Sequence, residues 1–284
     1  MNSPTLLVTG ATGNIGRALV RRLLEQGARV IAGSPSGQDV DGAPGRIVDY
    51  SRPDALARAF DGIDVLFLLL PLVPDKLELA QRALVAARAA GVGHVLRSSG
   101  AGADAGSDIA LARLQGRIDE AVVSSGLPWT LVRPSTFMQN FVNFHGGMIR
   151  SGTVHMSVGD GRTGYIDVED IAEVDARILL DPASHRGRTY TITGPEALTV
   201  REALDTIGEA LGRRIEYVPI PESSAVAAMT AMGMDPWSVE ILSSLNRATA
   251  AGLTAGTTTD VETITGRAPR RFDAFVRDHL AAWR

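Results

Sequence analysis

The sequence predicts an α/β fold, in which a Rossmann-type, doubly wound parallel sheet precedes a smaller C-terminal α/β lobe. Short apolar runs alternate with helix-length repeats through about the first 134 residues, a pattern typical of a parallel sheet with helices on both faces. The first run, 5–9, ends at a glycine-rich turn and has the composition of a strand buried on both sides. We therefore expect a sheet domain over residues 1–150 and a smaller lobe over 151–284 packed against it.

Changes in the hydrophobic period place the elements in order. The expected strands are 5–9, 29–32, 46–48, 64–70, 94–98 and 129–132. The expected helices run from the glycine turn to about residue 26 and over 53–60, 76–90 and 111–124, where apolar residues recur at helical spacing. After residue 140 the pattern loosens. We expect a helix or lid over 137–149 and shorter elements at 189–193, 200–212, 215–218 and 271–280.

Composition limits the possible functions. The net charge is −4 and no basic stripe is present, which argues against direct binding of nucleic acid. The absence of cysteine excludes disulfides and thiolate catalysis, and the histidines lack metal-ligand spacing, so no metal site is expected. The N-terminus lacks the features of a signal peptide, and the longest apolar run, 65–73, is too short to cross a bilayer. We expect a cytoplasmic protein with no membrane partner.

The glycine-rich turn has the spacing of a dinucleotide-binding site. Gly10, Gly13 and Gly16 follow the first strand as G-x-x-G-x-x-G. In such a turn the first glycine permits the tight bend, the second admits a pyrophosphate, and the third lets the helix approach the sheet. The helix N-terminus adds free N–H groups, and we expect Thr12, Asn14 and Ile15 to complete the cradle. A glycine turn without a ligand is the alternative.

The end of the second strand bears on the choice between NAD and NADP. NAD sites usually place a carboxylate there, whereas this chain has Gly33-Ser34-Pro35-Ser36. The Ser34 hydroxyl can donate to a 2′-phosphate that no acid in this stretch repels, so we expect NADP(H) rather than NAD(H). Arg17 either reaches that phosphate or is a solvated helix side chain. Asp49 either accepts from the adenine amino group, with Tyr50 beside it in the cofactor site, or begins the next helix.

Several segments together resemble the NmrA-like family of atypical short-chain dehydrogenase/reductases. The segments are the glycine turn, Ser98-Ser99, Leu127–Pro134 (LPWTLVRP), Phe137–Asn140 (FMQN), 165–172 and 260–267. The resemblance covers nearly the whole chain and implies a Rossmann domain with a C-terminal substrate lobe. It also implies that Leu69, Leu70 and Pro71 flank the nicotinamide ribose, that Ser98 belongs to the cofactor site, and that Pro134 to Phe137 pack near the nicotinamide. Members of this family include NADPH-dependent quinone, dye and imine or enone reductases, and also cofactor sensors without turnover.

The residue pair that supplies the proton in classical members of the wider family is absent. Those enzymes use Tyr-x-x-x-Lys on the helix after the serine strand, where this chain has Leu111 and Gln115. Leu111 cannot donate a proton, whereas Gln115 can hydrogen-bond a ribose hydroxyl. The only lysine, Lys76, lies in another βα unit, and we do not expect it to substitute. Three interpretations therefore stay open: solvent or another side chain supplies the proton, the substrate accepts hydride without an acid, or the protein only binds its cofactor.

Several residues could donate the proton or bind the substrate, but each could instead have a purely structural role. Ser99 could orient a substrate carbonyl or make a hydrogen bond at the strand end, and His145, which titrates in a useful range, could instead be a surface or core histidine. Asn140 could hold a polar substrate group or cap a helix. Tyr50 and Tyr165 are possible donors without supporting context. An apolar substrate pocket, or simply the core of the lobe, could be formed by Phe137, Phe141, Phe144 and Met148.

These observations predict an NADPH-dependent oxidoreductase that reduces a hydrophobic, aromatic or quinone-like small molecule by direct hydride transfer. Two alternatives stay open. One is an NADP(H) redox sensor that binds a protein partner, and the other is a biosynthetic helper enzyme acting on polyketide or alkaloid intermediates. A monomer and a homodimer are both compatible with the sequence.

Overall fold

The computed structural model describes residues 3–284, which form two compact units. Among the described residues, the first unit comprises 3–105, Leu114–Arg133 and Val168–Tyr190, and the second comprises Gly106–Arg113, Pro134–Asp167 and Thr191–Arg284. Met1 and Asn2 lie outside the described residues. They are part of the N-terminal segment in which we expected no signal peptide. No helix in residues 3–284 has both the length and the apolar character that a bilayer span requires.

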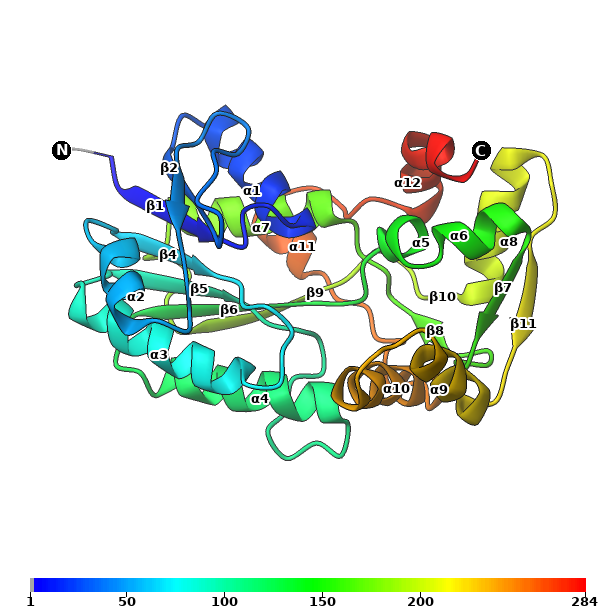
Figure 1. The fold of residues 1–284 in the computed structure, drawn as a ribbon. Coiled ribbons are helices and arrows are strands. Elements are labelled where there is room, and N and C mark those ends of the chain that lie inside the picture. The colour runs from blue at the N-terminus through cyan, green and yellow to red at the C-terminus, as the bar shows by residue number, and fades with distance from the viewer. Residues whose placement is uncertain (1–2) are drawn as a thin grey trace. The chain divides into compact units, whose positions relative to one another are not determined.

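A seven-stranded sheet organises the first unit, with the strand order β3-β2-β1-β4-β5-β6-β9 (Figure 1). The strands are β1 (Thr5–Thr9), β2 (Arg29–Ser34), β3 (Gly45–Ile47), β4 (Val65–Leu68), β5 (His94–Ser98), β6 (Trp129–Pro134) and β9 (Arg188–Ile192). Neighbouring strands from β3 to β6 pair in parallel. This is the doubly wound order, so the predicted fold class is confirmed. The strand order reverses between β1 and β4, and ligands of such sheets bind beyond the carboxyl ends at that point.

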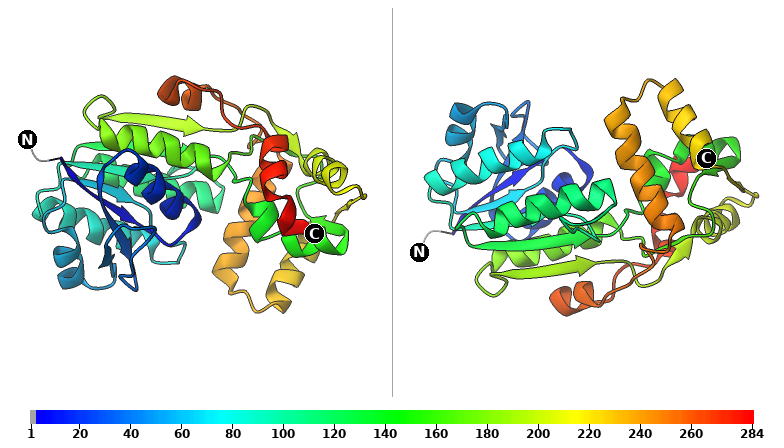
Figure 2. Two further views of the ribbon diagram at one scale, coloured as in Figure 1. Left: turned by 90° about the horizontal axis from the view of Figure 1, so that it is seen from above. Right: turned by 90° about the horizontal axis from the view of Figure 1, so that it is seen from below.

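Helices cover both faces of this sheet. One face carries α1 (Asn14–Glu25) and α7 (Val168–Leu180), and the other carries α2 (Pro53–Phe60), α3 (Lys76–Ala89) and α4 (Ala110–Val123) (Figure 1). Seen from below in Figure 2, α3 and α4 lie side by side. These helices hold the first turns of α1 and α3 at the carboxyl edge of the sheet, where the candidate site is built.

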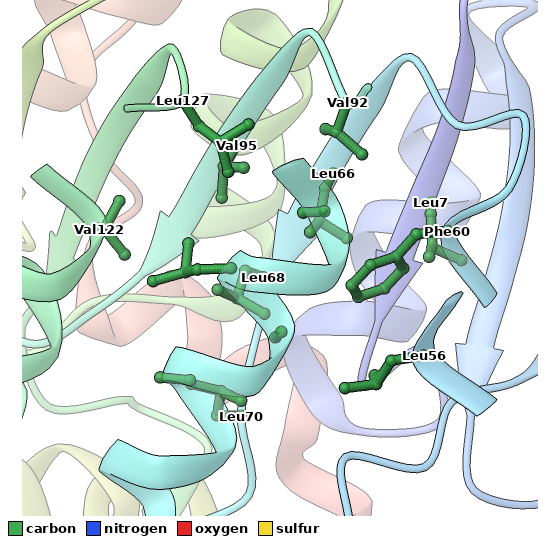
Figure 3. Packing of buried hydrophobic residues seen from close by; sticks show 14 of the residues in the cluster. Leu7, Leu56, Phe60, Leu66, Leu68, Leu70, Val92, Val95, Val122 and Leu127 are labelled. Atoms are coloured by element: carbon green, nitrogen blue, oxygen red, sulfur yellow. The ribbon is translucent and has the colours of Figure 1, made fainter. Parts of the chain in front are cut away.

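The core of the first unit lies between the sheet and the helices α2, α3 and α4. Figure 3 shows Leu56 and Phe60 of α2 beside Leu7 of β1, and all three side chains are fully buried. Leu66 of β4 and Val95 of β5 extend the same cluster. Each fully buried leucine or phenylalanine contributes about 1.5–3 kcal/mol relative to an exposed one, so this layer is a rigid base for the strand ends.

The second unit has two small two-stranded sheets and a helical layer. β7 (Thr153–Met156) pairs in parallel with β11 (Glu216–Pro219), and β8 (Arg162–Thr163) pairs antiparallel with β10 (Leu198–Thr199). Its helices are α5 (Asn140–Asn143), α6 (Gly146–Ser151), α8 (Val200–Leu211), α9 (Glu222–Ala231), α10 (Pro236–Ala250), α11 (Asp260–Thr265), α12 (Phe272–His279) and the 3-10 helix η1 (Leu280–Trp283). The predicted helix or lid over 137–149 is thus two short helices.

Candidate functional site

The glycine turn after β1 forms a cradle at the N-terminus of α1. Gly10 has a φ of +67°, a conformation that favours glycine. A Cβ on Gly16 would lie 2.1 Å from the Gly10 carbonyl oxygen, so no larger residue permits this approach. No side chain caps α1 and its first turn holds no acid. The first N–H groups of the helix and the positive end of its dipole are therefore suited to a pyrophosphate.

The end of β4 is fixed against the glycine turn by hydrogen bonds. The Thr9 hydroxyl lies 2.9 Å from the Phe67 carbonyl oxygen and accepts from the Leu69 N–H at 2.9 Å. The Tyr50 hydroxyl donates to the Leu69 carbonyl oxygen at 3.2 Å. Leu69, expected beside the nicotinamide ribose, is therefore held by two side chains. Burial raises the pKa of Tyr50, which makes its phenol a poor proton donor near neutral pH.

At the end of β2, polar side chains stabilise their own turns. The buried Ser34 hydroxyl accepts from the Gly37 N–H at 3.1 Å and lies 3.2 Å from the Ser36 hydroxyl oxygen. The Asp49 carboxylate accepts from the Ser51 N–H at 2.9 Å and from its hydroxyl at 2.6 Å. These hydrogen bonds lower the pKa of Asp49. Asp49 therefore already serves a local turn, and its second oxygen is the one left for an adenine.

A buried ionic cluster lies at the carboxyl end of β5. Arg97 pairs with Asp119 of α4, with 2.7 Å between Nη1 and Oδ1, and donates from Nη2 to the Gln115 Oε1 at 2.6 Å. Asp119 Oδ2 accepts from Arg133 Nε and from the Ser99 hydroxyl, both at 2.9 Å. The side chains of Arg97 and Asp119 are only 1% and 4% exposed. We call Arg97, Ser99, Gln115, Asp119 and Arg133 the Asp119 cluster.

The Asp119 cluster changes what two predicted site residues can do. Because Ser99 gives its proton to Asp119, its hydroxyl can accept a hydrogen bond but cannot donate to a substrate carbonyl while this bond is made. Gln115 uses its carbonyl oxygen on Arg97, which leaves the amide N–H groups as donors for a ribose hydroxyl. Ser98 is buried within β5.

A family model described as the NmrA-like family matches residues 2–252. The chain belongs to the NmrA-like family. An NAD(P)H azoreductase of Xenophilus azovorans is 33% identical over 283 residues, which are 98% of this chain and 99% of that protein. A (4-alkanoyl-5-oxo-2,5-dihydrofuran-3-yl)methyl phosphate reductase of Streptomyces griseus is 34% identical over 284 residues, with 98% and 99% covered. An Escherichia coli NADPH-dependent quinone oxidoreductase, solved in complex with NADPH, shares the fold with a TM-score of 0.84 at 22% identity, covering 96% of this chain and 99% of that one.

In this NmrA-like chain, Lys76 lies closer to the candidate site than we expected. It is the first residue of α3 and is 5% exposed. Burial and, to a smaller extent, the charge of Arg97 lower its pKa to about 7, while the charge of Asp119 acts in the opposite direction. Lys76 does belong to another βα unit, as the sequence indicated, but α3 and α4 cover the same face of the sheet, so its charge and those of Arg97 and Asp119 interact.

The aromatic residues predicted for a substrate pocket have different environments in the second unit. Phe141 is 2% exposed and packs edge-to-face on Tyr165 and Phe272, with ring centroids 5.2 and 5.1 Å apart. Its carbonyl oxygen accepts from the Trp283 indole at 2.9 Å. Phe144, in contrast, is 75% exposed. Phe141 is thus packed in the core of the second unit, whereas Phe144 lies at its surface.

The other predicted residues of the second unit are partly or fully buried. Burial lowers the pKa of His145 to about 4, so its ring is neutral near pH 7 and is not a ready acid. Burial raises the pKa of Tyr165 to about 12. Phe137 is half-buried and bridges to Ile166. Three further residues complete the set, the buried Pro134 and the half-buried Asn140 and Met148.

Sequence reasoning missed Thr9, Arg97, Asp119 and Arg133. One signal was available for Arg97, because an arginine that directly follows Val95 and Leu96 in a buried strand needs a buried partner. Asp119 follows Gln115 by one helical turn, so both side chains had to share a face of α4. Nothing in the sequence showed that this face would meet Arg97.

Proposed function

We propose that this NmrA-like oxidoreductase uses NADPH to reduce a hydrophobic, aromatic or quinone-like small molecule. The observation that carries the proposal is the close approach of Gly16 to Gly10 at an uncapped helix, at the point where the strand order reverses. The relatives support it, since their names describe reductases of an azo compound, an unsaturated phosphate ester and quinones.

Residues of the first unit would hold the cofactor from end to end. The turn Gly10–Gly16, with Thr12, Asn14 and Ile15, would bind the pyrophosphate through backbone N–H groups. Ser34 would face the adenine ribose, Leu69–Pro71 would flank the nicotinamide ribose, and Gln115 would donate to a hydroxyl of that ribose. Bound NADPH supplies a hydride, and the protein contributes orientation and the exclusion of water.

The preference for NADPH rests on the end of β2. The stretch 33–37 contains no acid, so no carboxylate there opposes a 2′-phosphate. The exposed Arg17 on α1 is a cation that could pair with this phosphate. We expect NADPH to bind at least about tenfold more tightly than NADH, which corresponds to about 1.4 kcal/mol.

Calorimetric titration with NADPH, NADP⁺, NADH and NAD⁺ tests the proposal, together with NADPH oxidation by quinones, azo dyes and cationic dyes. Ser36→Asp, at an exposed position of the same turn, should lower NADPH affinity by about tenfold or more and affect NADH little, because the new carboxylate repels the 2′-phosphate. Ser224→Asp is the matched control, since Ser224 is exposed on α9 in the second unit. Its affinities should equal those of the wild type.

Two outcomes would contradict the proposal in different ways. Failure to bind any dinucleotide would show that the glycine turn is not a cofactor site. Tight NADPH binding without turnover on any acceptor would instead favour the redox sensor.

A further inference from the structure

Lys76 is a largely buried lysine for whose ammonium the structure shows no hydrogen-bond partner. Its side chain is 5% exposed, and none of its contacts within residues 3–284 is a hydrogen bond or an ion pair from the ammonium. A buried lysine is ordinarily paired, because an unpaired charge in a low dielectric is costly. Many of the 27 arginines of the chain, in contrast, pair with carboxylates at the surface.

The charges around Lys76 do not compensate it. Arg97 on β5 and Arg133 on β6 share the single carboxylate of Asp119 on α4. On α2, the charged side chains Asp54 and Arg58 are exposed and pair with each other. Protonated Lys76 thus adds a positive charge near Arg97, whose one counter-charge, the Asp119 carboxylate, is already shared with Arg133. This excess favours release of a proton from Lys76 to a developing anion.

The other side chains at this edge of the sheet are poor acids. The Ser99 proton is committed to Asp119, and the Tyr50 proton to the Leu69 carbonyl oxygen. Gln115 does not ionise. Lys76 follows the Leu69–Pro71 stretch by one short loop and begins α3 at the carboxyl edge of the sheet, where the charges of Arg97 and Asp119 act on its ammonium.

We propose that the Lys76 ammonium donates the proton that the reduced substrate takes up, in place of the tyrosine that this chain lacks. The inference rests on the proposed reductase function. The substrate gains a hydride, and the displaced electron pair collects on its oxygen or nitrogen. That atom then takes a proton from Lys76 Nζ, the N–H electron pair stays on Nζ, and the neutral amine recovers a proton from water. In each turnover, one substrate, one NADPH and one proton give reduced substrate and NADP⁺.

Lys76 is the only lysine, which permits a direct measurement without turnover. Protein labelled with lysine carrying ¹³C at Cε gives one side-chain signal, and its shift can be followed from pH 5 to 11. The expected midpoint is about 7, far below the ordinary lysine value of about 10.4. Addition of NADP⁺ should shift the same signal, because the cofactor is proposed to lie beside this group. A midpoint near 10 would overturn the proposal.

Substitution of Lys76 provides the second test, in which two electron acceptors are compared and the one that needs no proton is the control. A naphthoquinone needs a proton after hydride transfer, whereas a cationic triphenylmethane dye becomes neutral on accepting hydride and needs none. Lys76→Met should lower kcat for the quinone by about 10²–10⁴-fold and remove the pH dependence near 7, while kcat for the dye and the NADPH affinity stay within about threefold of wild type. Lys76→Arg keeps the charge but not the ready proton, and should behave similarly with the quinone.

Arg82→Met is the matched control, because Arg82 lies on the same helix, is 42% exposed and pairs with Glu78 one helical turn away. It should leave both reactions unchanged. Equal turnover of the quinone by wild type and Lys76→Met would overturn the role of Lys76 while leaving the reductase intact. A wild-type protein that binds NADPH but reduces neither acceptor would instead overturn the reductase function, and the proton donor with it.

Discussion

At the scale of single residues, Gly16 determines whether the cradle can form. Gly16→Ala would place a Cβ 2.1 Å from the Gly10 carbonyl oxygen, so the turn or the first turn of α1 must move. Because the proposed pyrophosphate contacts are backbone N–H groups of this turn, we expect NADPH affinity to fall by about 100-fold or more. Calorimetric titration measures this loss.

A second glycine-to-alanine substitution, away from the cradle, tests whether the loss of NADPH affinity is specific to Gly16. Gly147 has no atom within 4 Å of the position that a Cβ would take, and it lies in α6 of the second unit. Gly147→Ala should bind NADPH like the wild type. If Gly16→Ala also retained full affinity, the cradle would not be the cofactor site.

Asp175 is a buried carboxyl in α7 that no neighbour compensates. Neither of its oxygens has a hydrogen-bond partner among the described residues, and burial raises its pKa well above the usual value. The folded protein therefore keeps a proton that the unfolded chain releases above about pH 4. It follows that this group makes the protein less stable as pH rises from about 4 toward the raised pKa.

Replacing Asp175 should remove this pH dependence. Asp175→Asn cannot ionise, so its stability relative to wild type should increase between pH 5 and pH 8 in urea unfolding. Asp175→Leu also removes the unpaired polar group and should add about 1–3 kcal/mol. Asp273→Asn provides a control of opposite sign, since a hydrogen bond from Arg277 lowers the pKa of the half-buried Asp273. Parallel pH profiles for wild type and Asp175→Asn would show that Asp175 is ionised in the folded state.

At the scale of elements, Asp119 attaches α4 to β5 and β6. Its carboxylate balances Arg97 and Arg133 in a buried setting. Asp119→Asn leaves both guanidiniums without a counter-charge, and we expect a loss of about 3–5 kcal/mol in the free energy of unfolding. Because Asp119 also raises the pKa of Lys76, the lysine NMR signal of this variant should titrate at a lower pH than in the wild type.

An exposed aspartate gives the comparison for this prediction. Asp54 pairs with Arg52 and Arg58, and its side chain is 55% exposed. Asp54→Asn should cost at most about 1 kcal/mol, because water screens such pairs. Similar losses in the free energy of unfolding of the two variants, measured in urea, would mean that the Asp119 cluster stabilises the protein no more than a surface ion pair does.

Most elements of the sheet domain could be predicted, because the apolar residues in each follow a single pattern, that of a buried strand or that of a helix face. The helix over 53–60 and the strands 5–9 and 94–98 have the predicted bounds. Helix α7 was missed, because Glu169, Asp170, Glu173 and Asp175 interrupt its apolar residues although ten of its 13 residues are buried. Periodicity assumes that acids face solvent, and this helix departs from that rule.

The candidate site was predictable only where local backbone geometry decides it. The spacing of Gly10, Gly13 and Gly16 reflects contacts within seven residues of chain, and the structure shows these contacts. The Asp119 cluster joins residues from β5, α4 and β6, and Lys76 approaches it from α3. Such contacts depend on which helix covers which strand, and that arrangement follows from the packing of the whole unit and not from a local pattern.

At the scale of the whole molecule, cofactor binding and folding are linked. A ligand that binds only the folded chain at 100 times its Kd raises the free energy of unfolding by about 2.7 kcal/mol. The proposed contacts lie in the first unit, so hydrogen exchange should show added protection of the N–H groups of residues 10–16 and of the ends of β2 and β4. The paired strands β7 and β11 of the second unit should serve as an internal reference, with little direct change. Protection confined to the second unit, or a stabilisation by NADPH that persists in Gly16→Ala, would place the cofactor outside the β1–α1 turn.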